Sequence, residues 1–175
     1  RICGKGFDDK ISICAGGEAV KLLDGTDCEI ILQLSSREEI GKSAAVGAYN
    51  TTPDLCVVLD VTGAKIPEEK DTIYKSSVMG GGAEISISAI TDVKLTKKLI
   101  KFAKDNSFPH QINVDGTNTG TNANDIPTIK CGVPTVLLSI PLLNMHTYAE
   151  IISLDDVIST SSLTAGFIKE FIKEG

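Results

Sequence analysis

The sequence is short of positive charge, and this shortage argues against one broad class of function. Lys and Arg together number 17 in the 175 residues, against 23 for Asp and Glu, so the formal net charge is -6. A nucleic-acid-binding domain normally carries a basic surface, which this composition does not predict. The sequence also has no apolar run long enough to span a membrane and no visible secretory leader or lipidation signal. We therefore expect no nucleic-acid or membrane partner and a cytoplasmic location.

Paired cysteines are absent as well. The five cysteines are odd in number, are scattered along the chain and form no Cys-x-x-Cys pair. This pattern argues against a disulfide framework. Most of these cysteines lie in apolar segments, so we expect buried free thiols in a reducing compartment. They are Cys3, Cys14, Cys28, Cys56 and Cys131.

Hydrophobic residues make up 42% of the chain, which is enough for one substantial core and indicates a single domain. Residues 11–23 place apolar side chains on one helical face before Gly25, and residues 28–36 have the composition of a buried strand. A short helix over 42–49 and a near-continuous apolar strand over 55–61 follow. Alternation of this kind predicts a parallel or mixed sheet with helices on both sides.

The second half of the chain continues this alternation. It predicts a strand over 83–89, an amphipathic helix over 95–103, strands over 110–115 and 133–140, and a loop over 116–124 that is rich in Gly, Thr and Asn. A capping-box-like pair, Ser153 and Asp156, predicts the start of a long terminal helix. The residues expected on the core side of that helix are Val157, Ile158, Ala165, Ile168 and Ile172.

The residues that could carry chemistry occur in four groups, and each group lies where a predicted strand gives way to a loop or helix. Two metal ions held close together need a bridging carboxylate, further carboxylate and imidazole ligands, and a free carboxylate that handles the proton of a water molecule. In an open α/β sheet, ligands bind beyond the carboxyl ends of the strands. The groups are Asp8-Asp9, Glu38-Glu39, Asp60 and His146.

Each group also has a simpler interpretation. Asp8-Asp9 suits the positive N-terminal end of a helix, and Glu38-Glu39 would be ordinary on a solvated loop. As functional pairs, one aspartate would bridge metals while its neighbour orients a ligand, and one glutamate would bind metal while the other acts as general base. Asp60 stands in an apolar strand, where an unpaired carboxylate is costly, so it needs a cation, hydrogen bonds or exposure. His146 alone is as consistent with a structural or exposed side chain as with a ligand.

The ordered combination of these groups resembles the tetrahedral aminopeptidases. This family of dinuclear metallopeptidases includes glutamyl aminopeptidases and proteins often labelled endoglucanase. The order and spacing of the short motifs agree over nearly the whole chain. The matching segments are Gly6–Ile11, Glu38–Gly41, Pro53-Asp54, Asp60–Thr62, Gly132–Thr135, Ser139–Pro141 and His146.

The resemblance implies a role for each site residue and a fold. It implies that Asp8 bridges two divalent metal ions, zinc or cobalt, that Asp9 supports the site beside it, and that Glu38 is the general base. The fold that it implies is a three-layer αβα sandwich with a mixed, mostly parallel sheet. The other metal ligands that it implies are Glu39, Asp60 and His146.

The sequence departs from the family pattern in three places. An N-terminal stretch that supplies another histidine, and the small β domain inserted after it, do not precede Arg1, so we expect residues 1–175 to be a catalytic domain that lacks both. His110 begins a strand where relatives tend to have an aromatic residue, and we do not assign it as a ligand. Thr121–Asn124 replaces a Thr-Asp-Ala-Gly loop, and Leu143 or Asn144 stands where a basic residue is expected, so substrate preference is not inherited.

We expect a metal-dependent aminopeptidase that acts on peptides, with this chain as an incomplete catalytic domain. One alternative is a non-catalytic domain that keeps the fold for assembly. A glycoside hydrolase is a weaker alternative, because it needs two carboxyl groups about 5 Å or more apart on opposite sides of the scissile bond, which adjacent glutamates do not readily provide. If the N-terminal stretch of the family contributes strands to the sheet, a chain without it has an unpaired sheet edge or an exposed apolar face. Such surfaces favour self-association, so we also expect a homo-oligomer.

Overall fold

One long parallel pair of strands, β2 (Cys56–Lys65) and β6 (Thr135–Leu143), forms the centre of the computed structural model, which describes residues 1–40, 43–66, 68–70 and 76–174. The pairing runs from Cys56 opposite Thr135 to Gly63 opposite Leu142. Both strands are rich in apolar residues because helices cover both of their faces. The prediction of two buried strands here is confirmed, although β2 continues beyond its predicted end, so that Asp60 lies inside the strand rather than near its terminus.

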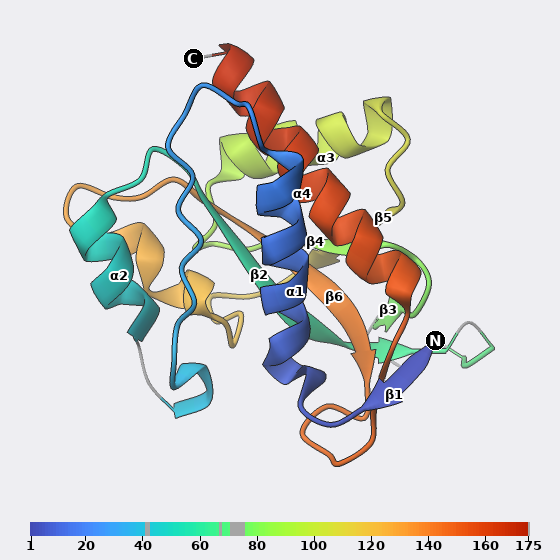
Figure 1. The fold of residues 1–175 in the computed structure, drawn as a ribbon. Coiled ribbons are helices and arrows are strands. Elements are labelled where there is room, and N and C mark those ends of the chain that lie inside the picture. The colour runs from blue at the N-terminus through green and yellow to red at the C-terminus, as the bar shows by residue number, and fades with distance from the viewer. Residues whose placement is uncertain (41–42, 67, 71–75, 175) are drawn as a thin grey trace.

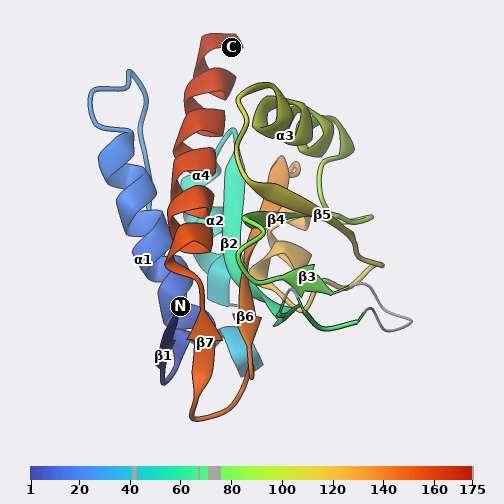
Figure 2. The same ribbon diagram turned by 90° about the vertical axis from the view of Figure 1, so that its right-hand side faces the viewer.

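The sheet is mixed and has seven strands, as predicted in kind (Figures 1 and 2). Besides the central pair, β4 runs parallel to β5, while β4 and β7 are both antiparallel to β6, and β1 is antiparallel to β7. A short parallel contact joins β3 to the end of β2. The remaining strands are β1 (Ile2–Gly4), β3 (Ser77–Val78), β4 (Ala83–Ile87), β5 (His110–Val114) and β7 (Glu150–Ile152).

Helices pack on both faces of the sheet, which confirms the three-layer arrangement. Val136, Leu138 and Ile140 of β6 pack against three helices on one face, whereas Leu137 packs against α2 and two short 3-10 helices on the other face. The helices of the first face are α1 (Phe7–Leu22), α3 (Val93–Asp105) and α4 (Leu154–Glu174). Those of the second face are α2 (Ser43–Thr51), η2 (Asn122–Asn124) and η3 (Ile126–Thr128).

Helix α4 begins at the predicted position but in a different way. The carboxylate of Asp156 accepts hydrogen bonds from the N–H groups of Gly80 (2.7 Å) and Gly82 (2.8 Å), so it joins the helix to a distant turn instead of completing a capping box with Ser153. The prediction that Ile158 faces the core is wrong, because its side chain is 60% exposed. No helix of the described residues combines the length and apolarity needed to cross a membrane.

The prediction of a buried strand at residues 28–36 is wrong. This segment is extended, but it belongs to no sheet, and Ile31 and Leu34 are 49% and 58% exposed. It runs between α1 and α2 (Figure 1), where the side-chain amide of Gln33 donates to the carbonyl oxygen of Ala44 at 2.9 Å. The composition favours a strand, but the segment pairs with no strand among the described residues.

The cysteines are free, as expected, but four of the five are exposed. Cys14 lies on α1 and faces away from the core that Ile11 and Ala15 of the same helix join. Apolar neighbours in sequence therefore did not indicate the buried side of the helix. Only Cys56 is largely buried among these five, and burial raises the pKa of its thiol to about 11. The predicted helix start at Lys42 lies outside the described residues.

Candidate metal centre

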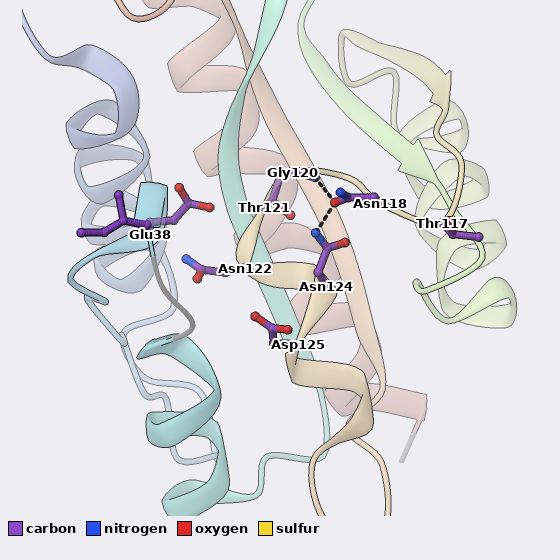
Figure 3. Close-up of a pocket in the computed structure, with 9 residues that line it drawn as sticks. Glu38, Thr117, Asn118, Gly120, Thr121, Asn122, Asn124 and Asp125 are labelled. Atoms are coloured by element: carbon purple, nitrogen blue, oxygen red, sulfur yellow. Dashed lines mark hydrogen bonds between the residues drawn. The ribbon is translucent and has the colours of Figure 1, made fainter.

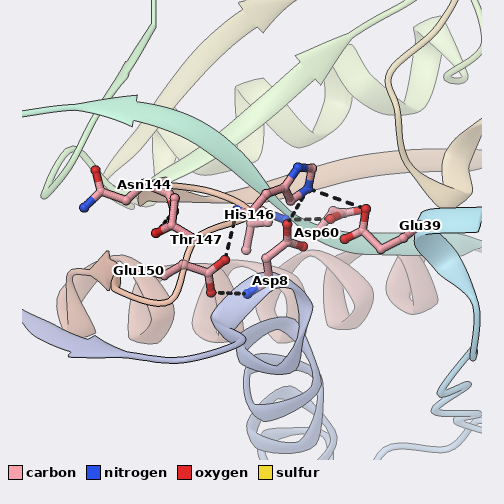
Figure 4. Close-up of polar contacts among 8 residues, drawn as sticks. Asp8, Glu39, Asp60, Asn144, His146, Thr147 and Glu150 are labelled. Carbon is pink, nitrogen blue, oxygen red and sulfur yellow. Dashed lines mark hydrogen bonds and ion pairs between the residues drawn. The ribbon is translucent and has the colours of Figure 1, made fainter.

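Segments that are far apart in the sequence bring four acidic or imidazole side chains together beside β2 (Figure 4). Asp8 stands in the first turn of α1, and Glu39 lies in the 3-10 helix η1 (Glu38–Ile40). Asp60 lies in β2, and His146 belongs to the loop between β6 and β7. Each residue enters from a different element, so the site depends on the fold and not on local sequence.

A first group of possible ligand atoms combines one imidazole with two carboxylates. Nε2 of His146 lies 3.0 Å from Oδ2 of Asp8 and 3.5 Å from Oε2 of Glu39, and the three ligand atoms lie within 4.8 Å of one another. The side chain of Asp8 is only 7% exposed, whereas those of Glu39 and His146 are 54% and 65% exposed. Asp8 therefore forms the buried base of a position that solvent and substrate can reach.

A second group consists of three carboxylates, from Asp8, Asp9 and Asp60, whose ligand atoms also lie within 4.8 Å of one another. Asp60 is 6% exposed, and its Oδ1 accepts the N–H of the adjacent Val61 at 2.8 Å. Oδ1 of Asp9 is buried and has no hydrogen-bond partner. Asp8 belongs to both groups, which is the geometry that a bridging carboxylate needs.

Burial and mutual repulsion make this cluster a poor place for negative charge alone. Burial, followed by the negative charge of Asp9, raises the pKa of Asp60 to about 8. Burial also raises the pKa of Asp9 to about 7, against the opposing effect of nearby Ser12. The pKa of Asp8 is raised by burial and by Glu39, while His146 acts in the opposite direction. A bound divalent cation would reverse these effects by favouring the ionised carboxylates.

Glu38 lies apart from both groups of ligand atoms and lines an adjoining cavity of about 460 Å³ (Figure 3). Burial raises the pKa of its carboxyl, and the charges of Glu39 and Asp8 add to that rise. The side chains that line the rest of the cavity are mostly amides and hydroxyls, and the residues are Ile40, Thr117, Asn118, Gly120, Thr121, Asn122, Asn124 and Asp125. Glu38 is thus positioned between the candidate metal site and a polar pocket.

Hydrogen bonds within the loop hold the shape of this pocket. Oδ1 of Asn124 accepts from the N–H of Thr119 at 3.0 Å, and the amide of Asn124 donates to Oδ1 of Asn118 at 2.6 Å (Figure 3). The same Asn118 oxygen accepts the N–H of Gly120 at 2.9 Å. The loop predicted over 116–124 therefore has an ordered network, and its last residues form the 3-10 helix η2.

A residue without a predicted role, Glu150, supports two of the candidate ligands. Its Oε2 accepts the backbone N–H of Asp8, and its Oε1 accepts the backbone N–H of His146, each at 3.1 Å (Figure 4). Glu150 is 2% exposed. His146 has a φ of 63°, a left-handed conformation that costs a non-glycine residue about 1–2 kcal/mol, and the bond from its N–H helps to hold it. The sequence signal was a lone acidic residue four positions after His146.

The structure brings together the residues that the sequence singled out as metal ligands, and it adds Asp9 to one of the two groups. The bridging, ligand and general-base roles themselves stay predictions. His110 lies at the start of β5, where its Nδ1 contacts the carbonyl oxygen of Phe108 at 2.8 Å, so it is not in either group. Gly41 of the predicted motif lies outside the described residues.

The chemistry of these side chains fits a divalent metal ion. Two carboxylates and one imidazole are a usual set of three protein ligands for a zinc site that keeps one position open. The buried Oδ1 of Asp9, which has no hydrogen-bond partner, and the nearly inaccessible Asp60 both gain an electrostatic partner if a cation binds. The first group could hold a metal through His146, Asp8 and Glu39.

Comparison with known proteins identifies relatives of this chain. The model of one protein family, described as M42 glutamyl aminopeptidase, matches residues 1–163. A lysyl aminopeptidase of Pyrococcus furiosus is 32% identical over 165 residues, and the alignment covers 94% of this chain and 47% of that protein.

Solved structures agree with this match. An aminopeptidase from the archaeon Desulfurococcus kamchatkensis superposes with a TM-score of 0.87 at 29% identity, over 96% of this chain and 49% of that one. The TET1 peptidase of Pyrococcus horikoshii, which can assemble into a tetrahedron or a large octahedral shell, has a TM-score of 0.72 at 27% identity, over 94% of this chain and 48% of that one. The chain thus spans about half the length of the relatives it matches.

Proposed function

The chain belongs to the M42 glutamyl aminopeptidase family, and from this membership we propose that it is the catalytic portion of a metal-dependent aminopeptidase. Its reaction is the removal of single residues from the free amino end of peptides. The metals that we propose are two divalent ions, zinc or cobalt. Because the chain spans about half of its relatives, full activity is proposed for the protein that also contains the remaining half.

One observation carries this proposal: Asp8 belongs to both groups of ligand atoms, and His146 and Glu39 complete the first of them within 4.8 Å. A shared carboxylate between two such groups is what a dinuclear hydrolytic site needs. A surface cluster of acidic residues would not require Asp8 to be 7% exposed or Asp60 to be 6% exposed.

We assign each residue a task in peptide hydrolysis. When bound, divalent ions would supply Lewis-acid polarisation of the peptide carbonyl and a water molecule of lowered pKa. The residues that would hold those ions are Asp8, Glu39, Asp60 and His146. Glu38 accepts a proton from the attacking water and then donates it to the nitrogen of the leaving peptide. Its raised pKa suits this exchange, since the carboxyl must both take up and release a proton.

The polar cavity beside Glu38 suits the side chain of the substrate's first residue. Amide and hydroxyl groups of the loop 117–125 offer hydrogen bonds but no deep apolar pocket. The reaction on peptides, the homo-oligomeric state and the cytoplasmic location are parts of the same proposal. The assembly of the Pyrococcus horikoshii relative supports an oligomer.

The direct test is cleavage of aminoacyl 4-nitroanilides with lysyl, glutamyl and leucyl groups by the protein that contains this chain together with the half that its relatives possess, loaded with zinc or cobalt. Free amino groups should be required, so the N-acetylated substrates serve as a control. Glu38→Gln should lower kcat by about 100- to 10,000-fold and leave bound metal unchanged, because only proton transfer is lost. Asp8→Ala should remove both metal and activity.

One result would favour the rival, a domain that keeps the fold for assembly without catalysis. It is tight metal binding with no cleavage of any free-amino substrate, even after the chain is combined with the half that its relatives possess. Activity that survives Asp8→Ala would instead contradict the role assigned to Asp8 in holding the metals. The adjacency of Glu38 and Glu39 in one 3-10 turn gives no support to glycoside hydrolysis.

A further inference from the structure

Two lysines lie at the start of α1, beside the candidate metal centre. Lys5 precedes the helix, and Lys10 lies in its first turn, where a Cβ at Gly6 would stand 3.2 Å from the Nζ atom of Lys10. Both lysines are exposed, and among the described residues neither forms an ion pair with a carboxylate. The whole chain has a formal net charge of -6, so these two ammonium groups are a local concentration of positive charge.

An exposed aromatic ring stands next to Lys5. Nζ of Lys5 lies 5.5 Å from the centre of the Tyr148 ring, a distance at which a cation is attracted to the face of an aromatic ring. The Tyr148 side chain is 86% exposed, so it does not serve the packing of the core. The ring thus keeps Lys5 close to the loop between β6 and β7, the loop that also carries His146.

The acidic groups closest in sequence to this corner have other partners. Oδ2 of Asp8 lies 3.0 Å from Nε2 of His146. The two carboxylate oxygens of Glu150 accept the backbone N–H groups of Asp8 and His146. The ammonium groups of Lys5 and Lys10 are therefore available to an anion from outside the chain.

The lysines and the polar cavity lie on opposite sides of the candidate metal centre. Figure 4 shows Glu39 on one side of Asp8, and Thr147 of the loop between β6 and β7 on the other side. The polar cavity adjoins η1, which contains Glu39. A peptide whose first side chain occupies the cavity and whose first carbonyl group lies at the metal centre therefore continues toward this loop and the two lysines.

We propose that Lys5, Lys10 and Tyr148 form a binding site for a carboxylate of the substrate, downstream of the peptide bond that is cut. This inference rests on the proposed aminopeptidase function and adds a substrate class to it. The class is short peptides whose third residue carries a carboxylate, either as the end of the chain or as an acidic side chain.

The length of a peptide agrees with this position. Three residues separate Lys5 from Asp8, so their Cα atoms are at most about 11 Å apart. In an extended peptide, the third residue begins about 7 Å beyond the first carbonyl group. Exposed pairs of opposite charges contribute little each, so we expect the carboxylate to raise kcat/KM about 3- to 10-fold, mostly through a lower KM.

Paired peptides test this expectation. The protein that contains this chain together with the half that its relatives possess is loaded with zinc, and leucine release from Leu-Gly-Gly and from Leu-Gly-Gly-amide is measured. One preparation cleaves both peptides, so any loss of active protein cancels in the ratio of the two kcat/KM values. The ratio should favour the free carboxylate, and high salt should reduce it. A second pair, Leu-Gly-Glu-amide and Leu-Gly-Gln-amide, reports whether an acidic side chain replaces the chain end.

Variants assign the preference to this corner of the molecule. Lys5→Gln combined with Lys10→Gln should bring the ratio close to 1, because both ammonium groups are lost. Tyr148→Ala should lower the ratio, whereas Tyr148→Phe keeps the ring beside Lys5 and should retain it. Lys21→Gln removes an exposed lysine near the other end of α1 and should leave the ratio as in the wild type.

The outcomes separate this inference from the aminopeptidase proposal. A preference for a carboxylate in either pair, lost in the double lysine variant and kept in Lys21→Gln, supports the binding site. Equal cleavage of both members of each pair by the wild type, or a preference that survives the double variant, overturns the binding site while the aminopeptidase proposal stands. Absence of cleavage of every free-amino substrate overturns both.

Discussion

Glu150 is the residue on which the geometry of the candidate ligands depends most directly. It is buried, and its two oxygens accept the N–H groups of Asp8 and His146 at 3.1 Å each. Glu150→Gln replaces one acceptor with an amide donor that opposes an N–H group. We expect zinc affinity to fall by about 10- to 100-fold, as is usual when a group that orients metal ligands is changed. Isothermal titration of zinc into the metal-free variant measures this.

Two further variants separate geometry from charge. Glu150→Asp keeps the negative charge but is too short to reach both N–H groups, so it should weaken zinc binding as Glu150→Gln does. Glu18→Gln removes an exposed charge on α1 and should leave zinc affinity unchanged. Full affinity in Glu150→Asp would mean that the charge of Glu150 and not its positioning role matters.

The four candidate metal ligands could be predicted from the sequence, whereas Glu150 could not. Asp8, Glu39, Asp60 and His146 were recognisable because their order matches a family motif, and the structure brings them together. Glu150 was missed because its role depends on which backbone groups lie beside β7 after folding. Its place four positions after His146 is a weak signal in the sequence, because it does not show which backbone groups the carboxylate will meet.

At the scale of the elements, Glu84 joins three strands. The hydroxyl of Ser77 in β3 donates to its carboxylate, and Thr62 in β2 donates at 3.4 Å. Burial raises the pKa of Glu84 above the usual 4.5, and the charge of Asp115 adds to the rise, although the hydroxyl donors oppose it. The native state therefore holds the Glu84 proton at pH values where the unfolded chain has lost it.

This linkage predicts a pH dependence. As the pH rises from 4.5 through the native pKa of Glu84, the free energy of unfolding should fall, by at most about 1.4 kcal/mol per pH unit from this one group. Glu84→Gln should flatten that slope, because the amide does not titrate. Urea unfolding at a series of pH values measures the difference. Asp24→Asn, at an exposed position, is the control, and equal slopes in the wild type and Glu84→Gln would contradict the prediction.

Elements were predictable where the apolar pattern alone determines burial. The central strands were found because they are near-continuous apolar runs, and α3 was found because Leu95, Leu99 and Ala103 repeat with the period of a helix. The segment 28–36 has the same kind of composition, yet it forms no strand among the described residues. A strand needs a neighbouring backbone as well as a pattern, and only the three-dimensional arrangement decides whether one is there.

For the whole molecule, the segment 28–36 is the part of the surface most suited to association. Leu32 lies beside Gly16 of α1, while Ile31 and Leu34 remain 49% and 58% exposed. Along residues 56–63, the described strands pair with β2 on one edge only, through β6. An extended apolar segment without backbone partners favours self-association. We therefore expect a dimer or larger assembly of the 175-residue chain.

A charge in this segment should weaken that association. Ile31→Lys places an ammonium group that would have to be buried in the interface, so the sedimentation coefficient should shift toward that of a monomer at the same concentration. Ile158→Lys is the matched control, because Ile158 is 60% exposed on α4 and lies outside the segment. Sedimentation velocity over a range of concentrations distinguishes the outcomes. A wild-type chain that stays monomeric at high concentration, or equal shifts in both variants, would show that residues 28–36 do not hold an interface.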